Sequence, residues 1–310
     1  MATSIIIDTD PGQDDAVALL LALGSPLDVV AITVVAGNVP LNLTVRNALV
    51  VCDVARRPEV PVYAGAGGPL EGALVTAEYV HGPTGLDGYE LPDPTRQASV
   101  GFAPDRIVEL VMSHPPGEIT LCTLGPLTNV ALALRQDPAI AGRLGGIVMM
   151  GGGFFEGGNT TPAAEFNIFV DPVAAAEVFR SGIDIVMMPL DVTHKVLSNS
   201  ARVDAFKQLG NHAGEVVAGW IGFFDRFDRE KYGTEGAPLH DPCVIAYLLE
   251  PDLFSGRYCN VEIETVSPLT KGMTVVDWWR VTDRPPNAHV MRDVDADGFF
   301  ALLTRTVGLL

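Results

Sequence analysis

The sequence predicts an α/β fold: an open, mostly parallel central sheet flanked by helices, with a Rossmann-like core, added helices and a small β-hairpin region. Two observations predict this core. Short runs rich in Ile and Val alternate with helical patterns across residues 5–188, and such alternation is typical of βαβ units. The apolar runs also stop at Gly, Pro, Asp or Asn, which favour a turn from a strand into a helix.

The first part of the chain predicts three strands, at Ile5–Ile7, Val29–Val35 and Val62–Ala64, because these runs are short, apolar and mostly β-branched. Between them we predict the helices Asp15–Leu23 and Leu43–Arg56. The first follows a Pro-Gly turn, and the second stops ahead of a proline. Residues 65–99 are rich in Gly and Pro, so we expect a long functional loop there.

The middle part continues the alternation. Apolar runs that stop at Gly or Pro predict strands at Ile119–Leu124, Ile147–Met150 and Ile185–Met188. Helical patterns predict helices at Asp105–Ser113, Leu127–Leu134 and Pro172–Ser181.

The pattern changes after Asp191. Residues 201–232, His240–Glu250 and the tail from Asp297 have helical patterns. Within residues 258–282, two short runs predict the β-hairpin region, at Asn260–Thr265 and Thr274–Asp277. The sequence has no internal repeat and no low-complexity linker, so we predict a single domain over residues 1–310.

The composition argues against several classes of protein. The chain is 48% hydrophobic and has a formal net charge of −18, so without a basic cluster we expect no binding to nucleic acid. No apolar stretch is long enough to predict a membrane span. The four cysteines form no C-x-x-C pair and no signal peptide is evident. We therefore expect reduced thiols in a cytoplasmic protein.

The most informative stretch follows the first predicted strand, where Asp8, Asp10, Asp14 and Asp15 fall within eight residues. Carboxylates this close repel one another unless a cation neutralises them, and a hard divalent ion such as Ca²⁺ prefers oxygen ligands. The carboxyl ends of parallel strands share one edge of a sheet, where distant segments can converge on a ligand. An acidic helix start that favours the helix dipole is the simpler alternative, but it does not require so many carboxylates.

A second acidic position, Asp241, directly precedes Pro242 at the start of a predicted helix. Asp241 suits the N-cap of that helix, so it can be a simple cap, a ligand or both. Other polar residues are expected to be structural. Asp8 would support the site from behind, and Thr128 and Asn129 would cap the helix after the strand that begins at Ile119.

The run from Asp8 to Asp15 (DTDPGQDD) resembles the signature of the nucleoside hydrolase family, of the inosine–uridine preferring type. Further motifs similar to those of the family follow in family order: Ala36-Gly37-Asn38, His81-Gly82, Gly125–Asn129, Met150–Gly153, Ala164–Asn167, Asp171-Pro172, His240–Pro242 and Gly272–Asp277. One such motif would be weak evidence, whereas the ordered set is highly specific.

The resemblance implies a single calcium ion at the bottom of a ribose pocket. Its ligands would be the side chains of Asp10, Asp15 and Asp241 and the backbone carbonyl of Leu124. A water molecule and the ribose 2′- and 3′-hydroxyls would complete the shell. Asp10 would also act as the general base that takes a proton from the attacking water.

The resemblance also implies the contacts to the substrate. Met150 would pack under the sugar, His81 would cover the base, and His240 would protonate or stabilise the departing base. His194 lies in no recognised motif and receives no role. The ribose hydroxyls would be held by three pairs of polar residues: Asp14 and Asn38 at the 2′ position, Asn167 and Asp241 at the 3′ position, and Asn159 and Glu165 at the 5′ position.

We therefore expect a calcium-dependent enzyme that hydrolyses the N-glycosidic bond of ribonucleosides to free base and ribose. Pyrimidine-preferring or broad specificity is favoured, with purine specificity as the alternative. The variable region that would decide between them contains Phe224, Asp228 and Tyr232. Because members of the family are commonly dimers or tetramers, a homo-oligomer is also expected.

Two alternatives from other classes stay open at this point. A phosphohydrolase of the haloacid dehalogenase type is one, because D-x-D also opens that family, although the Pro-Gly-Gln-Asp-Asp continuation argues against it. The other is a non-catalytic protein that binds calcium and ribose and senses nucleosides.

Overall fold

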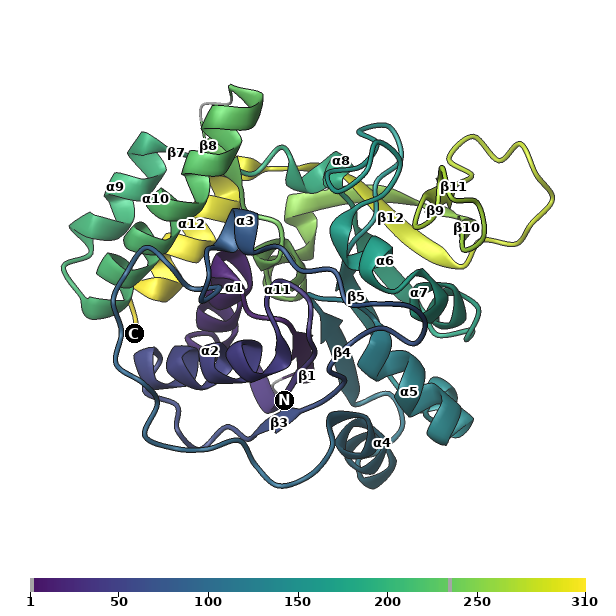
Figure 1. Cartoon of the computed structure of the whole chain (residues 1–310), viewed down its shortest axis with the longest axis horizontal. Coiled ribbons are helices and arrows are strands. Elements are labelled where there is room, and N and C mark those ends of the chain that lie inside the picture. Colours follow the sequence, from purple (N-terminus) through teal and green to yellow (C-terminus); the bar gives the residue numbers. More distant parts are fainter. Residues whose placement is uncertain (1–2, 234–235) are drawn as a thin grey trace.

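The computed structural model describes residues 3–233 and 236–310, with only the backbone described for 227–232. At its centre lies an eight-stranded sheet with the strand order β3-β2-β1-β4-β5-β6-β12-β9 (Figure 1). Neighbouring strands are parallel except β9, which is antiparallel to β12. The predicted mostly parallel sheet is confirmed. Its strands are β1 (Ser4–Thr9), β2 (Asp28–Val34), β3 (Val62–Ala64), β4 (Ile119–Thr123), β5 (Gly146–Met150), β6 (Ile185–Met188), β9 (Phe254–Cys259) and β12 (Ala288–Val294).

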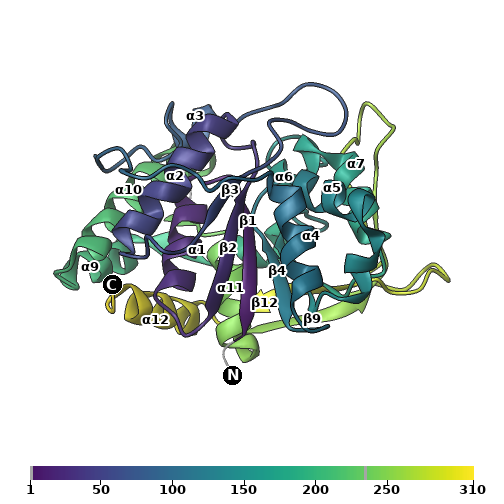
Figure 2. The ribbon, with the colours of Figure 1, turned by 90° about the horizontal axis from the view of Figure 1, so that it is seen from below.

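Helices cover both faces of the sheet, as Figure 2 shows. The strands are therefore apolar on both sides: Ile5 and Ile7 pack into one hydrophobic cluster and Ile6 into the other. The first cluster includes α1 (Gln13–Leu23), α2 (Leu41–Val54), α9 (Ser200–Gln208), α10 (His212–Tyr232), α11 (Pro242–Leu249) and α12 (Ala296–Val307). The second includes α4 (Ala103–Ser113), α5 (Thr128–Gln136) and α7 (Pro172–Phe179).

Shorter elements complete the described chain. The predicted hairpin region contains an antiparallel pair, β10 (Val261–Ile263) with β11 (Thr274–Val276). Within the described residues, no helix is long and apolar enough to cross a bilayer. The remaining short elements are α3 (Glu78–His81), α6 (Phe166–Val170), α8 (Leu190–Thr193), the antiparallel pair β7 (Leu197–Asn199) and β8 (Gly236–Pro238), and 3-10 turns at Pro138–Gly142 and Pro251–Leu253.

Two sequence-based expectations about the C-terminal part were incomplete. Strands β9 and β12 belong to the main sheet, yet neither was predicted, because their polar residues and the glycine in β9 hide the strand pattern. Residues 201–232, which have a helical pattern, form two helices with a break between them. The break between α9 and α10 contains Gly210, whose φ of +67° is left-handed and ends the helix.

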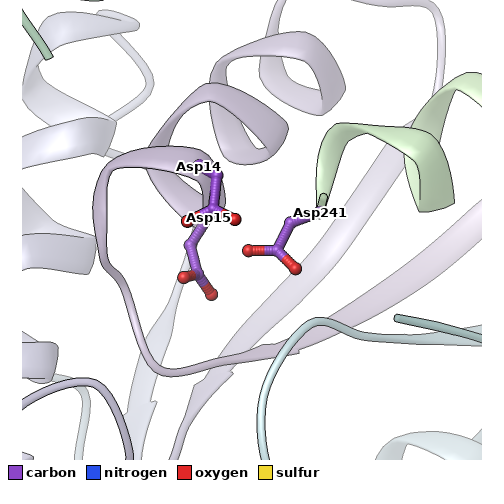
Figure 3. Close-up of side chains that lie close together, drawn as sticks. All are labelled: Asp14, Asp15 and Asp241. Carbon is purple, nitrogen blue, oxygen red and sulfur yellow. The ribbon is translucent and has the colours of Figure 1, made fainter. Parts of the chain in front are cut away.

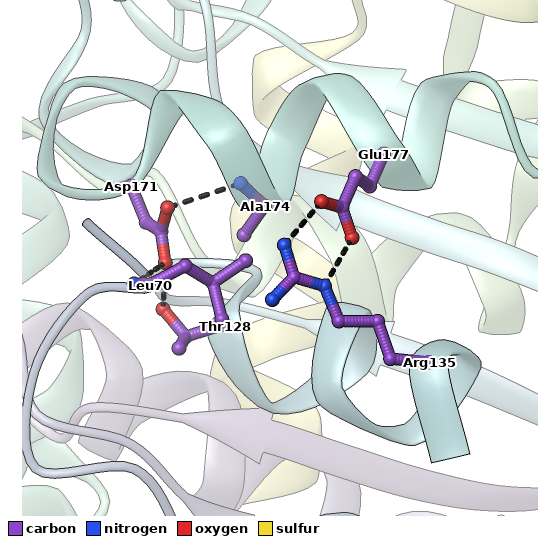
Figure 4. Close-up of polar contacts among 6 residues, drawn as sticks. All are labelled: Leu70, Thr128, Arg135, Asp171, Ala174 and Glu177. Carbon is purple, nitrogen blue, oxygen red and sulfur yellow. Dashed lines mark hydrogen bonds and ion pairs between the residues drawn. The ribbon is translucent and has the colours of Figure 1, made fainter.

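Asp171 joins three segments on the face of the sheet that carries α5 and α7 (Figure 4). Its Oδ1 accepts a hydrogen bond from the N–H of Ala174 at 3.0 Å and so caps α7. Its Oδ2 accepts from Thr128 Oγ1 at 2.7 Å and from the N–H of Leu70 at 2.8 Å. One buried carboxylate therefore ties the start of α7 to the start of α5 and to the loop after β3.

Candidate functional site

The turn from β1 into α1 is wrapped around the carboxylate of Asp15. This carboxylate accepts hydrogen bonds from Thr9 Oγ1 at 2.5 Å, from the N–H of Gly12 at 3.0 Å and from the N–H of Asp10 at 3.3 Å. Asn38, which follows β2, donates to it through Nδ2 at 3.0 Å. The turn lies at the carboxyl end of β1, between β2 and β4 in the sheet order, where open α/β sheets bind their ligands.

Three carboxylates from two distant segments converge beside this turn (Figure 3). Asp14, Asp15 and Asp241 each offer an oxygen, and these oxygens all lie within 4.8 Å of one another. Asp14 and Asp15 lie in the first turn of α1, and Asp241 occupies the N-cap position of α11. The side chain of Asp241 makes no capping hydrogen bond, so its interpretation as a simple cap is wrong.

Asp10 and Leu124 lie next to this cluster. Asp10 Oδ2 accepts a hydrogen bond from the N–H of Asn38 at 2.8 Å, whereas Asp10 Oδ1 is buried without a partner in the described part of the chain. A Cβ on Gly125 would lie 2.1 Å from that Oδ1, so glycine is needed there. The carbonyl of Leu124 accepts from Asn167 Nδ2 at 2.7 Å and has a second lone pair.

Burial and mutual repulsion dominate the electrostatics of the cluster. Burial, with the charge of Asp15 as the second cause, raises the pKa of Asp14 to about 8. Burial and then the charge of Asp15 raise the pKa of Asp10 well above its usual range. Burial and then the charge of Asp14 do the same to the pKa of Asp241. Without a cation, these carboxylates cannot all be ionised at neutral pH at low cost.

A cavity of about 420 Å³ opens beside the carboxylates. Asp10 and Asp15 are fully buried and are not part of its lining. Every other residue that the sequence predicted for the site lines this one cavity: Asp14, Asn38, His81, Leu124, Met150, Asn159, Glu165, Asn167, His240 and Asp241.

The polar residues on the wall formed by 150–167 are held by backbone groups. Glu165 accepts from the N–H of Gly152 at 2.8 Å and of Asn167 at 2.9 Å. Asn159 Oδ1 accepts from the N–H of Phe166 at 3.0 Å. Because these contacts fix the side chains before any ligand arrives, the wall presents preorganised carboxylate and amide groups of the kind that hold hydroxyls.

Two buried histidines complete the lining. Burial lowers the pKa of His81 to about 3, and burial, followed by the nearby His194, lowers the pKa of His240 to about 3, so both rings are neutral at pH 7. His240 Nδ1 lies 2.7 Å from Thr193 Oγ1. The ring of His81 stacks on Phe224, with centroids 5.6 Å apart, which gives this part of the cavity an aromatic wall.

Sequence reasoning missed several residues of the cavity, among them the neighbours His194 and Glu156. His194 Nδ1 lies 3.3 Å from Glu156 Oε2, and its ring centroid lies 5.8 Å from that of His240. Since each follows a strand of the parallel sheet, their position at the common edge was the available signal. The side chains of Asp228 and Tyr232, named for base choice, lie outside the described residues.

Asp8 lies behind the site, as expected. Its Oδ1 accepts hydrogen bonds from Thr33 Oγ1 at 2.6 Å and Asn129 Nδ2 at 2.8 Å. The expected capping by Thr128 and Asn129 is wrong, since α5 has no side-chain cap. Both side chains instead donate to buried carboxylates, Thr128 to that of Asp171 and Asn129 to that of Asp8, because a buried carboxylate oxygen left without a hydrogen bond is costly.

Comparison with known proteins fits this geometry. Residues 5–301 match the family described as inosine-uridine preferring nucleoside hydrolase. The chain belongs to this family. It is therefore a ribonucleoside hydrolase, and the phosphohydrolase alternative is wrong. The buried Asp cluster is consistent with a metal site typical of the family.

Three relatives illustrate the likeness. An uncharacterised protein of Schizosaccharomyces pombe is 52% identical and is aligned over 99% of both chains. The pyrimidine-specific ribonucleoside hydrolase RihA of Salmonella paratyphi B is 47% identical over 98% of this chain and 97% of its own. The solved purine-preferring ribonucleoside hydrolase of Gardnerella vaginalis is 33% identical, with a TM-score of 0.92 over 99% of this chain and 98% of its own.

Proposed function

We propose that this chain acts as a single domain that hydrolyses ribonucleosides to free base and ribose with calcium, and that it prefers pyrimidine nucleosides. The observation that carries the proposal is the convergence, in one cavity, of buried carboxylates from the first turn of α1 and the start of α11 with the preorganised polar wall around Glu165. This combination suits a cation and a polyhydroxylated sugar together.

The residues present fit a calcium ion. The cluster and its neighbours offer only oxygen ligands, and the unpartnered Oδ1 of Asp10 is an acceptor that lacks its donor or cation. Asp10, Asp15, Asp241 and the carbonyl of Leu124 would hold the ion. When bound, calcium would neutralise the carboxylates, fix two ribose hydroxyls and lower the pKa of a water molecule.

The protein groups then supply the remaining chemistry. Asp10 takes a proton from the attacking water at Oδ1. The oxygen of that water bonds to C1′ of the ribose while the glycosidic C–N bond breaks, and the electron pair of that bond leaves with the base. His240, held at Nδ1 by Thr193, would give a proton or a hydrogen bond to the departing base through Nε2.

The carboxylates and amides of the cavity would discriminate for ribose. Asp14 and Asn38 would hold the 2′-hydroxyl, Asn167 and Asp241 the 3′-hydroxyl, and Asn159 and Glu165 the 5′-hydroxyl, with Met150 beneath the sugar. A substrate that lacks one of these hydroxyls would leave a buried polar group unpaired, which costs about 1–3 kcal/mol.

The preference for pyrimidines is supported by the relative named pyrimidine-specific, which is 47% identical over nearly the whole chain. Purine preference is the second candidate, because a purine-preferring relative has the same fold. The test is hydrolysis of uridine, cytidine, inosine and adenosine side by side, with calcium and after its removal by a chelator. We expect uridine and cytidine to be hydrolysed fastest and only with calcium; faster purine hydrolysis would reverse the preference.

Release of base from any of these nucleosides would also exclude a non-catalytic nucleoside sensor. Tight binding of ribose or nucleosides with calcium, without release of base from any of the four nucleosides, would favour the sensor and overturn the hydrolase.

We also propose a homo-oligomer, dimer or tetramer, in the cytoplasm. Exposed aromatic side chains support self-association: Phe155 and Trp279 are 51% and 67% exposed, and Arg257 lies over the Trp279 ring at 5.7 Å. The four cysteines are buried and free, which suits a reducing compartment. Light scattering at several concentrations would measure the oligomeric state, and a monomer throughout would contradict it.

A further inference from the structure

Gln13 begins α1 directly before Asp14, yet within the described residues its side-chain amide bonds only to the segment 81–87. Nε2 donates to the carbonyl of His81 at 2.9 Å and to the carbonyl of Asp87 at 3.0 Å. Only the NH₂ end of an amide can donate two hydrogen bonds, so these carbonyls fix its orientation. Because Gln13 is buried, with 1% of its surface exposed, water cannot replace these contacts.

The fixed amide determines which ring nitrogen of His81 carries the proton. Oε1 of Gln13 lies 2.7 Å from His81 Nδ1. An amide oxygen has no proton to give, so Nδ1 must be the donor in this contact. The neutral form of the ring, which burial favours, has only one proton. Nε2 is therefore left with a lone pair.

The ring of His81 is held between the β1–α1 turn and Phe224. One side of the ring approaches the β1–α1 turn, where a Cβ on Gly12 would lie 2.4 Å from Nδ1. The ring also stacks on Phe224 and lines the cavity. In the described part of the chain, His81 Nε2 has no hydrogen-bond partner. A ligand in the cavity is the natural source of the missing donor.

We propose that Gln13 is a positioning residue that fixes His81 as a hydrogen-bond acceptor, and that His81 thereby selects ribonucleosides whose base presents an N–H donor, such as N3–H of uracil or the amino group of cytosine. This inference rests on the proposed function. Because Nε2 has no proton, His81 is not the group that protonates the departing base, which leaves that role to His240.

The tautomer is tested without any activity measurement. Long-range ¹H–¹⁵N spectra of the calcium-loaded protein, labelled at histidine nitrogens, distinguish Nδ1–H from Nε2–H. We expect the wild-type His81 signals, assigned by their loss in His81→Phe, to show Nδ1–H. Gln13→Met removes the acceptor and should move His81 toward Nε2–H, whereas Gln13→Glu keeps an acceptor and should keep the proton on Nδ1. His240 should not change in either variant.

Recognition of the N–H donor is tested with two methylated uridines of equal size. In 3-methyluridine the methyl group replaces the donor, whereas 5-methyluridine keeps it. In the wild type, we expect kcat/KM for 3-methyluridine to be at least about 100-fold lower than for 5-methyluridine, because a site that pairs with a substrate N–H rejects an analogue without it. Gln13→Met should reduce this ratio of the two kcat/KM values at least tenfold, whereas Gln13→Glu should not reduce it.

The possible results separate the parts of the proposal. Nε2–H or a doubly protonated ring at His81 in the wild type would overturn it, as would equal effects of Gln13→Met and Gln13→Glu on the tautomer. Equal use of both methylated uridines would overturn the recognition step. If nucleosides bind but are not cleaved, the proposed function fails. The dissociation constants of 3-methyluridine and 5-methyluridine then test recognition of the N–H donor in the same way.

Discussion

At the scale of single residues, two neighbouring carboxylates have opposite hydrogen-bond environments. Asp15 accepts from Thr9, Gly12, Asp10 and Asn38, so its position is fixed by the turn itself. Asp10 has one oxygen satisfied and the other unpartnered and buried. An unsatisfied buried acceptor costs about 1–3 kcal/mol and persists where function requires it. In the proposed mechanism, the turn would fix Asp15 as a cation ligand, and the unpartnered Oδ1 would let Asp10 act both as a ligand and as the base for water.

The two roles proposed for Asp10 predict the effect of Asp10→Ala on turnover. We expect kcat/KM for uridine to fall at least ~10³-fold, because a metal ligand and the general base are lost together. Asp10→Asn, of equal size, should lose nearly as much rate. Calorimetric titration should show weaker calcium binding in both, and Asp53→Ala, at an exposed site on α2, is the matched control. Near-normal turnover of Asp10→Ala would refute the mechanism.

Residue identities in the site could be predicted far better than their contacts. Ten of the residues predicted from the resemblance line one cavity, and eight of them belong to the ordered motifs. The motifs could not show that Asp241 leaves its helix uncapped, or that Thr128 bonds to Asp171. Such choices depend on which acceptors are buried nearby in the folded chain. His194 was missed because it lies in no recognised motif, and the folded chain brings it beside His240.

At the scale of elements, Asp171 and Arg135 connect α5 and α7 in two different ways (Figure 4). Asp171 is buried and accepts three hydrogen bonds, from Thr128, Leu70 and Ala174. Arg135 forms a two-pronged ion pair with Glu177 at the surface, at 2.8 and 2.5 Å. Burial makes the first connection costly to break, whereas solvent screens the second.

We therefore predict unequal losses of stability for Asp171→Ala and Arg135→Ala. The first removes the cap of α7 and leaves buried donors unpaired, so it should lower the free energy of unfolding by about 2–4 kcal/mol. The second should lower it by no more than about 1 kcal/mol. Urea unfolding followed by circular dichroism measures both losses of free energy of unfolding. Equal losses would contradict the prediction that the buried contacts of Asp171 stabilise the fold more than the surface ion pair of Arg135.

The strands of the core could be predicted because both faces of each are covered, which leaves nearly continuous apolar runs such as Ile5–Ile7. Strands β9 and β12 could not. β9 is the edge strand of the sheet, and its exposed Arg257 and Tyr258 give a pattern that is typical of a loop. β12 pairs with β9 and alternates buried and partly exposed residues, including His289 and Arg292. Their pairing is a long-range feature that local pattern does not contain.

At the scale of the whole molecule, the fold brings mutually repelling carboxylates together at one edge of its sheet. The order β2-β1-β4 brings the turn after β1 against Leu124, and α11 packs on α1 so that Asp241 meets Asp14 and Asp15. In a chain of net charge −18, this cluster opposes folding unless protons or a cation neutralise it. Stability should therefore depend jointly on pH and calcium.

The sign of that dependence follows from Asp14. Its pKa is raised from 3.8 to about 8 in the folded chain. A raised pKa gives stability that is fully present below about pH 4, where the unfolded chain is also protonated. This stability is lost as pH rises toward 8. Without metal, Tm should fall from pH 5 to pH 8. In the proposed function, calcium would bind only the folded, deprotonated cluster, so it should raise Tm more at pH 8 than at pH 5.

Thermal unfolding at pH 5 and pH 8, each with calcium or with a chelator, measures both effects. Asp14→Asn distinguishes the contribution of Asp14 from the titration of the other groups, because it removes one buried charge without changing the size of the side chain. In the chelated state, this variant should lose less stability than the wild type between pH 5 and pH 8. If the stability of Asp14→Asn depends on pH as that of the wild type does, the titration of Asp14 does not affect stability. If calcium raises Tm equally at both pH values, the buried carboxylates do not repel one another as their burial implies.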